Sequence, residues 1–130
     1  MILDTSVVVA VLNDEPSRSK LETIISAADS KLSSVSYLEA STVLLNRRGE
    51  EALSSLDSWL EAAGIEVVPF TAVQARLARS AYARFGKGRH PAGLNFGDCA
   101  SYGLAMDEGE ELLFQGGDFG LTDLRTVNVG

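Results

Sequence analysis

The stretch MILDTSVVVAVL, residues 1–12, decides the fold, because it places a short apolar run directly before an acid. The residues before Asp4 predict a buried strand that ends where the carboxylate stands. A helix is expected after Thr5 or Ser6, although the β-branched residues 7–12 leave a strand as the competing interpretation. An acid in this position is poor packing unless a function requires it there.

The rest of the chain alternates short apolar runs with amphipathic segments. Further strands are expected at residues 31–35, 65–70, 111–115 and 126–129. Helices are expected at residues 16–28, 36–48, 51–63, 72–85 and 95–106. Ser36 stands as an N-cap and Glu39 follows it at capping-box spacing. This alternation predicts βαβ units and a mainly parallel sheet covered on both faces, in one α/β domain over residues 1–130.

Four acids stand where such a sheet would gather them. Asp4 and Asp118 each follow an expected strand, Glu39 lies in the helix after another, and Asp98 lies early in a helix of small residues. Sites in open parallel sheets form beyond the carboxyl ends of the strands. Two carboxylates 4 Å apart repel by about 4 kcal/mol at an effective dielectric constant near 20, so a cation is expected among them. Oxygen ligands without His or Cys point to Mg²⁺ or Mn²⁺.

Each acid taken singly has an ordinary structural explanation. Glu39 fits the second half of a capping box, Asp98 a first-turn acid favoured by the helix dipole, and Asp118 a common turn residue. Asp4 is the hardest to explain in this way. The joint placement of the four is what indicates a site.

Four segments together carry a family resemblance. They are ILDTS (2–6), SYLEA (36–40), NFGDC (95–99) and LLFQGGDF (112–119). In this order and at these spacings they closely resemble PIN domains, and among those the VapC-type toxins of bacterial toxin–antitoxin pairs. The resemblance covers essentially the whole chain. It implies a three-layer α/β/α sandwich with a Mg²⁺ or Mn²⁺ site.

The resemblance also implies roles for the acids. Asp4 and Asp98 would bind the metal directly, and Glu39 would bind it or orient the attacking water. Asp118 would be the fourth acid, although Gly116-Gly117 stand where relatives often carry another polar residue, which leaves Asp123 as an alternative. Ser6 or Thr5 would steady Asp4 and a nearby water, which also makes Ser6 a candidate contact to the substrate.

A basic, glycine-spaced loop offers a surface for RNA. Arg84, Lys87 and Arg89 are candidate contacts to the RNA backbone, and His90 is a phosphate contact rather than a general base. Tyr82 or Phe85 is available to stack on bases. The alternative for this loop is a solvated segment with no ligand.

The resemblance implies an endoribonuclease toxin that hydrolyses phosphodiesters with metal-activated water. Its partners would be an RNA substrate, a VapB-like antitoxin and a second copy of the chain in a homodimer. The net charge of −7 fits either an acidic surface with no polyanion partner or an acidic metal site with a local basic rim, and a basic antitoxin would also suit it. The absence of a signal-like segment, the absence of a long apolar run and the single cysteine predict a cytoplasmic protein without a membrane anchor.

Other acid-bearing α/β proteins fit less well. A receiver domain needs an acidic pair after the first strand, and a haloacid-dehalogenase-like phosphatase needs a second Asp where Ser6 stands. A nucleotide-binding domain needs a glycine-rich loop after the first strand. A non-catalytic PIN-like module that binds RNA or protein remains the alternative, although such modules usually lose a core acid.

Overall fold

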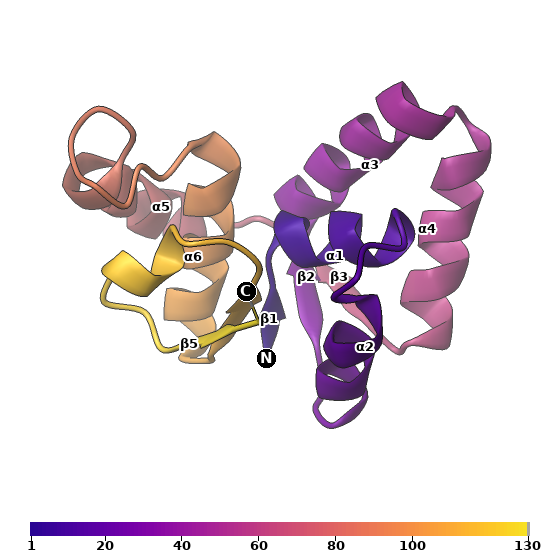
Figure 1. Ribbon diagram of the computed structural model, residues 1–130. Helices are drawn as coiled ribbons and strands as arrows, with labels where there is room; N and C mark the ends of the chain where they lie inside the picture. The colour runs from indigo at the N-terminus through magenta and orange to yellow at the C-terminus, as the bar shows by residue number, and fades with distance from the viewer. Residues whose placement is uncertain (130) are drawn as a thin grey trace.

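A five-stranded sheet with helices on both faces organises the computed structural model, which describes residues 1–129 (Figure 1). The strands are β1 (Ile2–Leu3), β2 (Lys31–Ser33), β3 (Glu66–Val68), β4 (Leu112–Phe114) and β5 (Thr126–Asn128). Their order is β3-β2-β1-β4-β5, and every pairing is parallel. The α/β/α sandwich with a parallel sheet is therefore confirmed.

The chain reverses its direction across the sheet at β1. It builds outward from β1 to β2 and β3, and then returns to place β4 and β5 on the other side of β1. Parallel crossovers are right-handed, so this reversal puts the connecting helices on opposite faces. One face carries α1 (Thr5–Leu12), α2 (Arg18–Ser26), α3 (Ser34–Arg48) and α4 (Glu51–Ala62), and the other carries α5 (Ala72–Phe85) and α6 (Phe96–Glu108) (Figure 1). The reversal point is where ligand sites form in such sheets.

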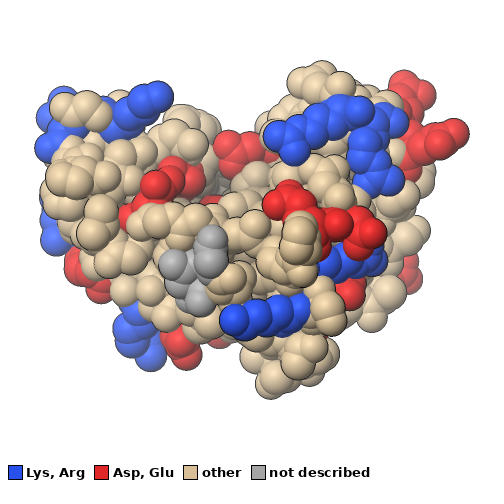
Figure 2. Space-filling model, viewed as in Figure 1, with Lys and Arg blue, Asp and Glu red and all other residues tan. Residues whose placement is uncertain are grey.

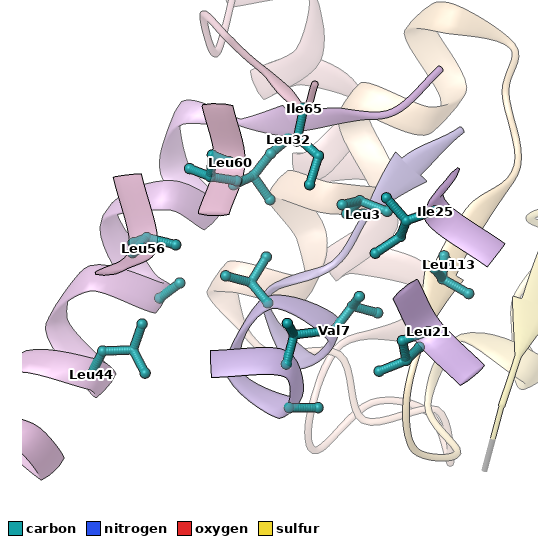
Figure 3. Close-up of a cluster of buried hydrophobic side chains, with 14 of the residues drawn as sticks. Leu3, Val7, Leu21, Ile25, Leu32, Leu44, Leu56, Leu60, Ile65 and Leu113 are labelled. Atoms are coloured by element: carbon teal, nitrogen blue, oxygen red, sulfur yellow. The ribbon is translucent and has the colours of Figure 1, made fainter. Parts of the chain in front are cut away.

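The strands are buried on both faces, and their side chains alternate between two cores. Leu3, Leu32 and Leu113 face the larger core with α1 to α4 (Figure 3). Ile2 and Leu112 face the smaller core beneath α5 and α6. This burial on both sides explains why the strands read as continuous apolar runs.

The observed start and extent of α1 and α3 settle one open question and correct one prediction. Residues 7–12 lie in α1, so the strand interpretation is wrong. Ser36 is not an N-cap: α3 begins two residues earlier, because Ser33 ends β2 and its hydroxyl accepts from Val35 N. Glu39 therefore lies well inside α3 and is not part of a capping box.

The other helix boundaries follow the expected pattern. Thr71 caps α5 through its Oγ1, which accepts from Gln74 N at 3.2 Å. Arg48 ends α3 before Gly49, as predicted. The short 3-10 helix η1 (Phe119–Leu121) connects β4 to β5. Within residues 1–129 no helix has the length and apolar character needed to cross a membrane.

Candidate active site

Asp4 occupies the centre of the sheet edge at the end of β1. Its backbone N–H donates to Leu113 O at 3.0 Å, which ties it to the neighbouring strand β4. Its side chain caps α1, because Oδ2 accepts from Ser6 N at 3.0 Å. The residue is only 4% exposed. Asp4 thus directly follows the buried strand β1 and is the N-cap of α1.

A chain of buried hydroxyls holds the other oxygen of Asp4. Ser101, on α6, donates its Oγ hydrogen to Asp4 Oδ1 at 2.7 Å. Ser36, on α3, lies 3.1 Å from the same Ser101 oxygen, and since the hydrogen of Ser101 is committed to Asp4, Ser36 donates to Ser101. Both serines are fully buried. These bonds connect α3, α6 and β1 and give each Asp4 oxygen a donor, as a buried carboxylate requires.

Glu39 reaches across from α3 to the first turn of α6. A Cβ atom on Gly97 would lie 2.3 Å from Glu39 Oε1 and 2.4 Å from Oε2. Only glycine leaves room for this carboxylate at this distance. The absence of a side chain at residue 97 therefore places Glu39 directly beside Asp98.

Asp98 is held at the start of α6 by a reciprocal capping box. Its Oδ2 accepts from Asn95 N at 2.9 Å, and Asn95 Oδ1 accepts from Asp98 N at 2.8 Å. Burial, which is the largest cause, and the charges of Asp4, Asp118 and Glu39 together raise the pKa of Asp98 to about 7, against the opposing effect of the Asn95 N–H. The structure thus gathers Asp4, Glu39 and Asp118 around the carboxyl group of the fourth predicted acid, Asp98.

The two candidates for the fourth acid, Asp118 and Asp123, lie in different surroundings. Asp118 is exposed, stands before η1 and is one of the charges that act on Asp98. Asp123 instead accepts from Tyr102 Oη at 2.7 Å and pairs with Arg84 at 3.2 Å. These partners lower the pKa of Asp123 in spite of its partial desolvation, which opposes them. Asp118 is therefore the acid that faces the cluster.

The two hydroxyls after Asp4 have separate surroundings. Ser6 contributes its backbone N–H to Asp4, while its Oγ accepts from Gln115 N at 3.1 Å and so ties α1 to the end of β4. The buried Thr5 Oγ1 has no partner within the described residues. It is thus a polar atom beside Asp4 that a water or ligand would satisfy.

The basic loop after α5 is partly committed to the fold. Arg84 pairs with Asp123, and its guanidinium also lies 4.6 Å from the centre of the Phe85 ring. Phe85 is buried against His90, so the prediction that it stacks on bases is wrong. His90 Nδ1 accepts from Ala92 N at 3.0 Å, which gives this histidine a structural role in the loop.

Lys87, Arg89 and Tyr82 remain exposed near the loop. Figure 2 shows acidic side chains in the hollow between the two sides of the molecule. Basic side chains gather on the shoulder over the α5 side and on the shoulder over α3. An anion approaching the acids would thus pass between two basic surfaces.

The residues present fit a hydrated hard cation in their chemistry. Within residues 1–129, no three Asp, Glu, His or Cys side chains are arranged closely enough to hold one ion directly. Mg²⁺ often binds through one or two carboxylates and keeps several waters. A cation would also relieve the repulsion that raises the pKa of Asp98. Metal binding here remains a prediction.

Sequence reasoning missed Gly97, Asn95, Ser36 and Ser101 as parts of this site. A signal existed for the two serines, because Ser36 precedes Glu39 by three residues and Ser101 follows Asp98 by three. That spacing puts each serine on the same helix face as an acid. No local pattern distinguishes Gly97 from the other glycines of the chain.

Comparison with known proteins identifies the family of this chain. The family model described as PIN domain matches residues 1–123. Ribonuclease VapC30 of Mycobacterium tuberculosis is 49% identical over 128 residues, which cover 98% of each chain. The family-model match spans the four acids and the strands β1 to β4.

Solved structures share the fold at low sequence identity. VapC20 of Mycobacterium tuberculosis, described as a toxin that cleaves the sarcin–ricin loop, matches with a TM-score of 0.77 and 19% identity over 95% of each chain. VapBC2 from Rickettsia felis, bound to a promoter DNA fragment, matches with a TM-score of 0.78 and 19% identity over 99% of this chain and 98% of that one. The match to the PIN-domain model and the 49% identity to VapC30 show that the chain belongs to the PIN-domain family, and within that family it is of the VapC type.

Proposed function

We propose that this chain is the endoribonuclease toxin of a toxin–antitoxin pair and that it hydrolyses RNA with Mg²⁺ or Mn²⁺. The observation that carries the proposal is the convergence of Asp4, Glu39 and Asp118 on Asp98 at the reversal point of the sheet. Relatives about half identical over nearly the whole chain are named ribonucleases. Such an acidic cluster suits phosphodiester hydrolysis, because a cation can offset both the carboxylates and the scissile phosphate.

Each acid has a role that follows from its surroundings. Asp4 and Asp98 are the proposed direct ligands, since both are fixed by hydrogen bonds before any ion arrives. Within the described residues 1–129 the Glu39 carboxylate accepts no hydrogen bond, so it is suited to orient the attacking water. The exposed Asp118 is suited to complete the cation site. When bound, the cation would supply positive charge at the phosphate and an acidified water.

Substrate contacts are proposed for Lys87, Arg89 and Ser6, with Arg84 contributing only if its pairing with Asp123 opens. The Lys87 and Arg89 side chains are exposed on the loop after α5 and would contact the RNA backbone. Attack by water rather than by the ribose 2′-hydroxyl would leave 3′-hydroxyl and 5′-phosphate ends.

The test is cleavage of total cellular RNA by purified protein, with Mg²⁺, with Mn²⁺ and with chelator. Discrete fragments that require the metal and are absent with Asp4→Ala and Asp98→Ala would support the proposal. Glu61→Gln is the matched control, since Glu61 is an exposed acid on α4 away from the site. Products that end in 2′,3′-cyclic phosphate, or full activity in chelator, would overturn the proposed mechanism.

A non-catalytic PIN-like module is the second candidate, and the lack of a preassembled three-ligand group within residues 1–129 favours it. Binding of RNA or of a protein partner without cleavage, in either metal, would support this alternative. Circular dichroism on the same sample would show that the protein tested was folded.

A VapB-like antitoxin is the proposed protein partner, and the likeness to VapBC2 supports it. The net charge of −7 would favour a basic partner segment. Copurification with the product of an adjacent small reading frame, and loss of RNA cleavage in that complex, would test it. The predicted homodimer is checked by light scattering on the free toxin.

A further inference from the structure

A second hollow lies next to the acids and is not explained by the metal chemistry. Between α5 and α6 the structure contains an open cavity of about 540 Å³. Ala78, Cys99 and Ala100 form its apolar floor. This volume falls within the range of about 300–1,000 Å³ that small-molecule sites occupy.

Two aromatic side chains stand uncovered at this cavity. Phe96 is 81% exposed and Tyr82 is 42% exposed, and both line the cavity wall. Phe96 is the first residue of α6, a position that the helix itself does not require to be aromatic. Leaving such large apolar area in water is unfavourable, so a flat partner surface would stabilise it.

Two cations flank the same cavity. Arg79 and Lys87 line it, and neither forms an ion pair with any residue in the described part of the chain. Arg84, between them in sequence, is by contrast paired with Asp123. In a chain with a net charge of −7, two uncompensated cations beside exposed aromatic rings favour an anionic, aromatic ligand.

The cavity opens directly beside the acidic site. Asn95 and Phe96 lie on its wall, while Gly97 supports the Glu39 carboxylate and Asp98 follows at once. A nucleotide bound in the cavity would therefore be a near neighbour of any phosphate held at the acids. Single-stranded RNA presents this combination of bases that can stack and phosphates that bind cations.

We propose that this cavity receives one unpaired nucleobase of the RNA substrate, close to the scissile phosphate, and that Phe96 and Tyr82 stack on it. Arg79 and Lys87 contact the adjoining phosphates. The proposal rests on the proposed function, since it concerns the same substrate, and it assigns to the α5–α6 cavity the selection of a single-stranded target.

The test measures binding without cleavage. Fluorescently labelled single-stranded hexaribonucleotides, and strands of the same length with abasic residues, are titrated in chelator with protein in an Asp98→Asn background. Phe96→Ala should weaken binding of the base-carrying strands by roughly 5- to 150-fold, the range expected for loss of one stacked base. It should leave binding of the abasic strands unchanged.

Arg79→Gln should weaken binding to both kinds of strand and reduce the slope of log Kd against log salt by about 1, because it removes a phosphate contact. The matched controls are Val73→Ala and Arg76→Gln, which alter exposed residues on the same helix that do not line the cavity. Both controls should bind as the parent does.

Several results would overturn the inference. One is that the parent and Phe96→Ala bind the base-carrying strands equally well. Another is that Phe96→Ala weakens binding of the abasic strands as much as binding of the base-carrying strands. A third is that the parent binds neither kind of strand. A change in oligomeric state of Phe96→Ala by light scattering would assign the cavity to a protein interface instead. Binding that depends on Phe96 without cleavage by the wild type in either metal would refute the proposed function and leave this inference standing. If the wild type cleaves RNA and Phe96→Ala cleaves it equally well, this inference would be refuted and the proposed function would stand.

Discussion

The carboxylate of Glu39 lies where the side chain of residue 97 would be: a Cβ on Gly97 would come within 2.3 Å of Glu39 Oε1. The contact joins α3 to α6 and brings together two residues that are 58 positions apart in the sequence. The neighbour is the end of a flexible side chain, so it can move aside. A methyl group here would thus displace Glu39 without disturbing the backbone.

Gly97→Ala is therefore expected to reduce RNA cleavage while preserving the fold. Alanine is favoured over glycine inside a helix by roughly 1 kcal/mol, which offsets the cost of moving Glu39. We expect the Tm to stay within a few degrees of the wild type and the cleavage rate to fall by about 10- to 100-fold, as when a supporting residue of a metal site is lost.

Gly103→Ala is the matched control on the same helix. A Cβ at residue 103 would lie 2.5 Å from Gln74 O, a backbone atom of α5 that cannot move aside. Such overpacking costs about 1–3 kcal/mol, so the Tm should fall by several degrees. The reverse pattern in these two variants, with Gly97→Ala unstable and active, would contradict the placement of Glu39.

Asp98→Asn should change how stability depends on pH. The folded-state pKa of Asp98 is about 7, against 3.8 for an unperturbed aspartate. Between these two values the folded state holds a proton that the unfolded state releases, so the wild-type stability falls as pH rises from about 4 to about 7. Asparagine removes this loss and keeps the oxygen that accepts from Asn95 N.

Thermal melts in chelator at pH 4 to 8 would measure this effect. The Tm of Asp98→Asn minus that of the wild type should grow with pH up to about 7 and then level off. Adding Mg²⁺ at pH 8 should raise the Tm of the wild type more than that of the variant. A difference that stays constant across the range would show that Asp98 ionises normally.

Ser101→Ala should destabilise the protein more than Ser36→Ala does. Ser101 donates directly to the buried carboxylate of Asp4, whereas Ser36 donates to the neutral hydroxyl of Ser101. Loss of a donor to a buried charged group costs about 1–3 kcal/mol or more, and loss of a neutral hydrogen bond about 1 kcal/mol. Urea unfolding at neutral pH compares the two, and an equal effect would mean that water replaces Ser101.

Asp118→Asn and Asp123→Asn should separate activity from stability. Asp118 acts on the cluster, so its variant should lose cleavage by at least about tenfold and keep its Tm. Asp123 is bound by Tyr102 and Arg84, so its variant should melt lower while retaining cleavage within a few-fold. Cleavage rates on total RNA and thermal melts of the same samples would show which of the two variants loses activity and which loses stability. Loss of cleavage only in Asp123→Asn would reverse the assignment of the fourth acid.

The local pattern of the sequence determined the fold class and the positions of the acids. The spacing of apolar residues predicts strand or helix because side chains return to the same face every two residues in a strand and every 3.6 residues in a helix. An acid directly after a buried strand must lie at the sheet edge, which placed Asp4. Asp118 was expected near the same edge because only a short glycine turn separates it from the expected strand at residues 111–115. The predicted N-cap at Ser36 failed because three closely spaced serines, Ser33, Ser34 and Ser36, offer alternative caps.

Only the tertiary structure decided which distant residues meet. The order β3-β2-β1-β4-β5 brings α3 and α6 together at β1, and this creates the contact of Glu39 with Gly97 and the bond from Ser101 to Asp4. The same packing buries Phe85 and leaves Phe96 uncovered. These outcomes depend on contacts between residues far apart in the chain. Periodicity describes one element at a time, so it contains no information about which side chain of another element lies opposite.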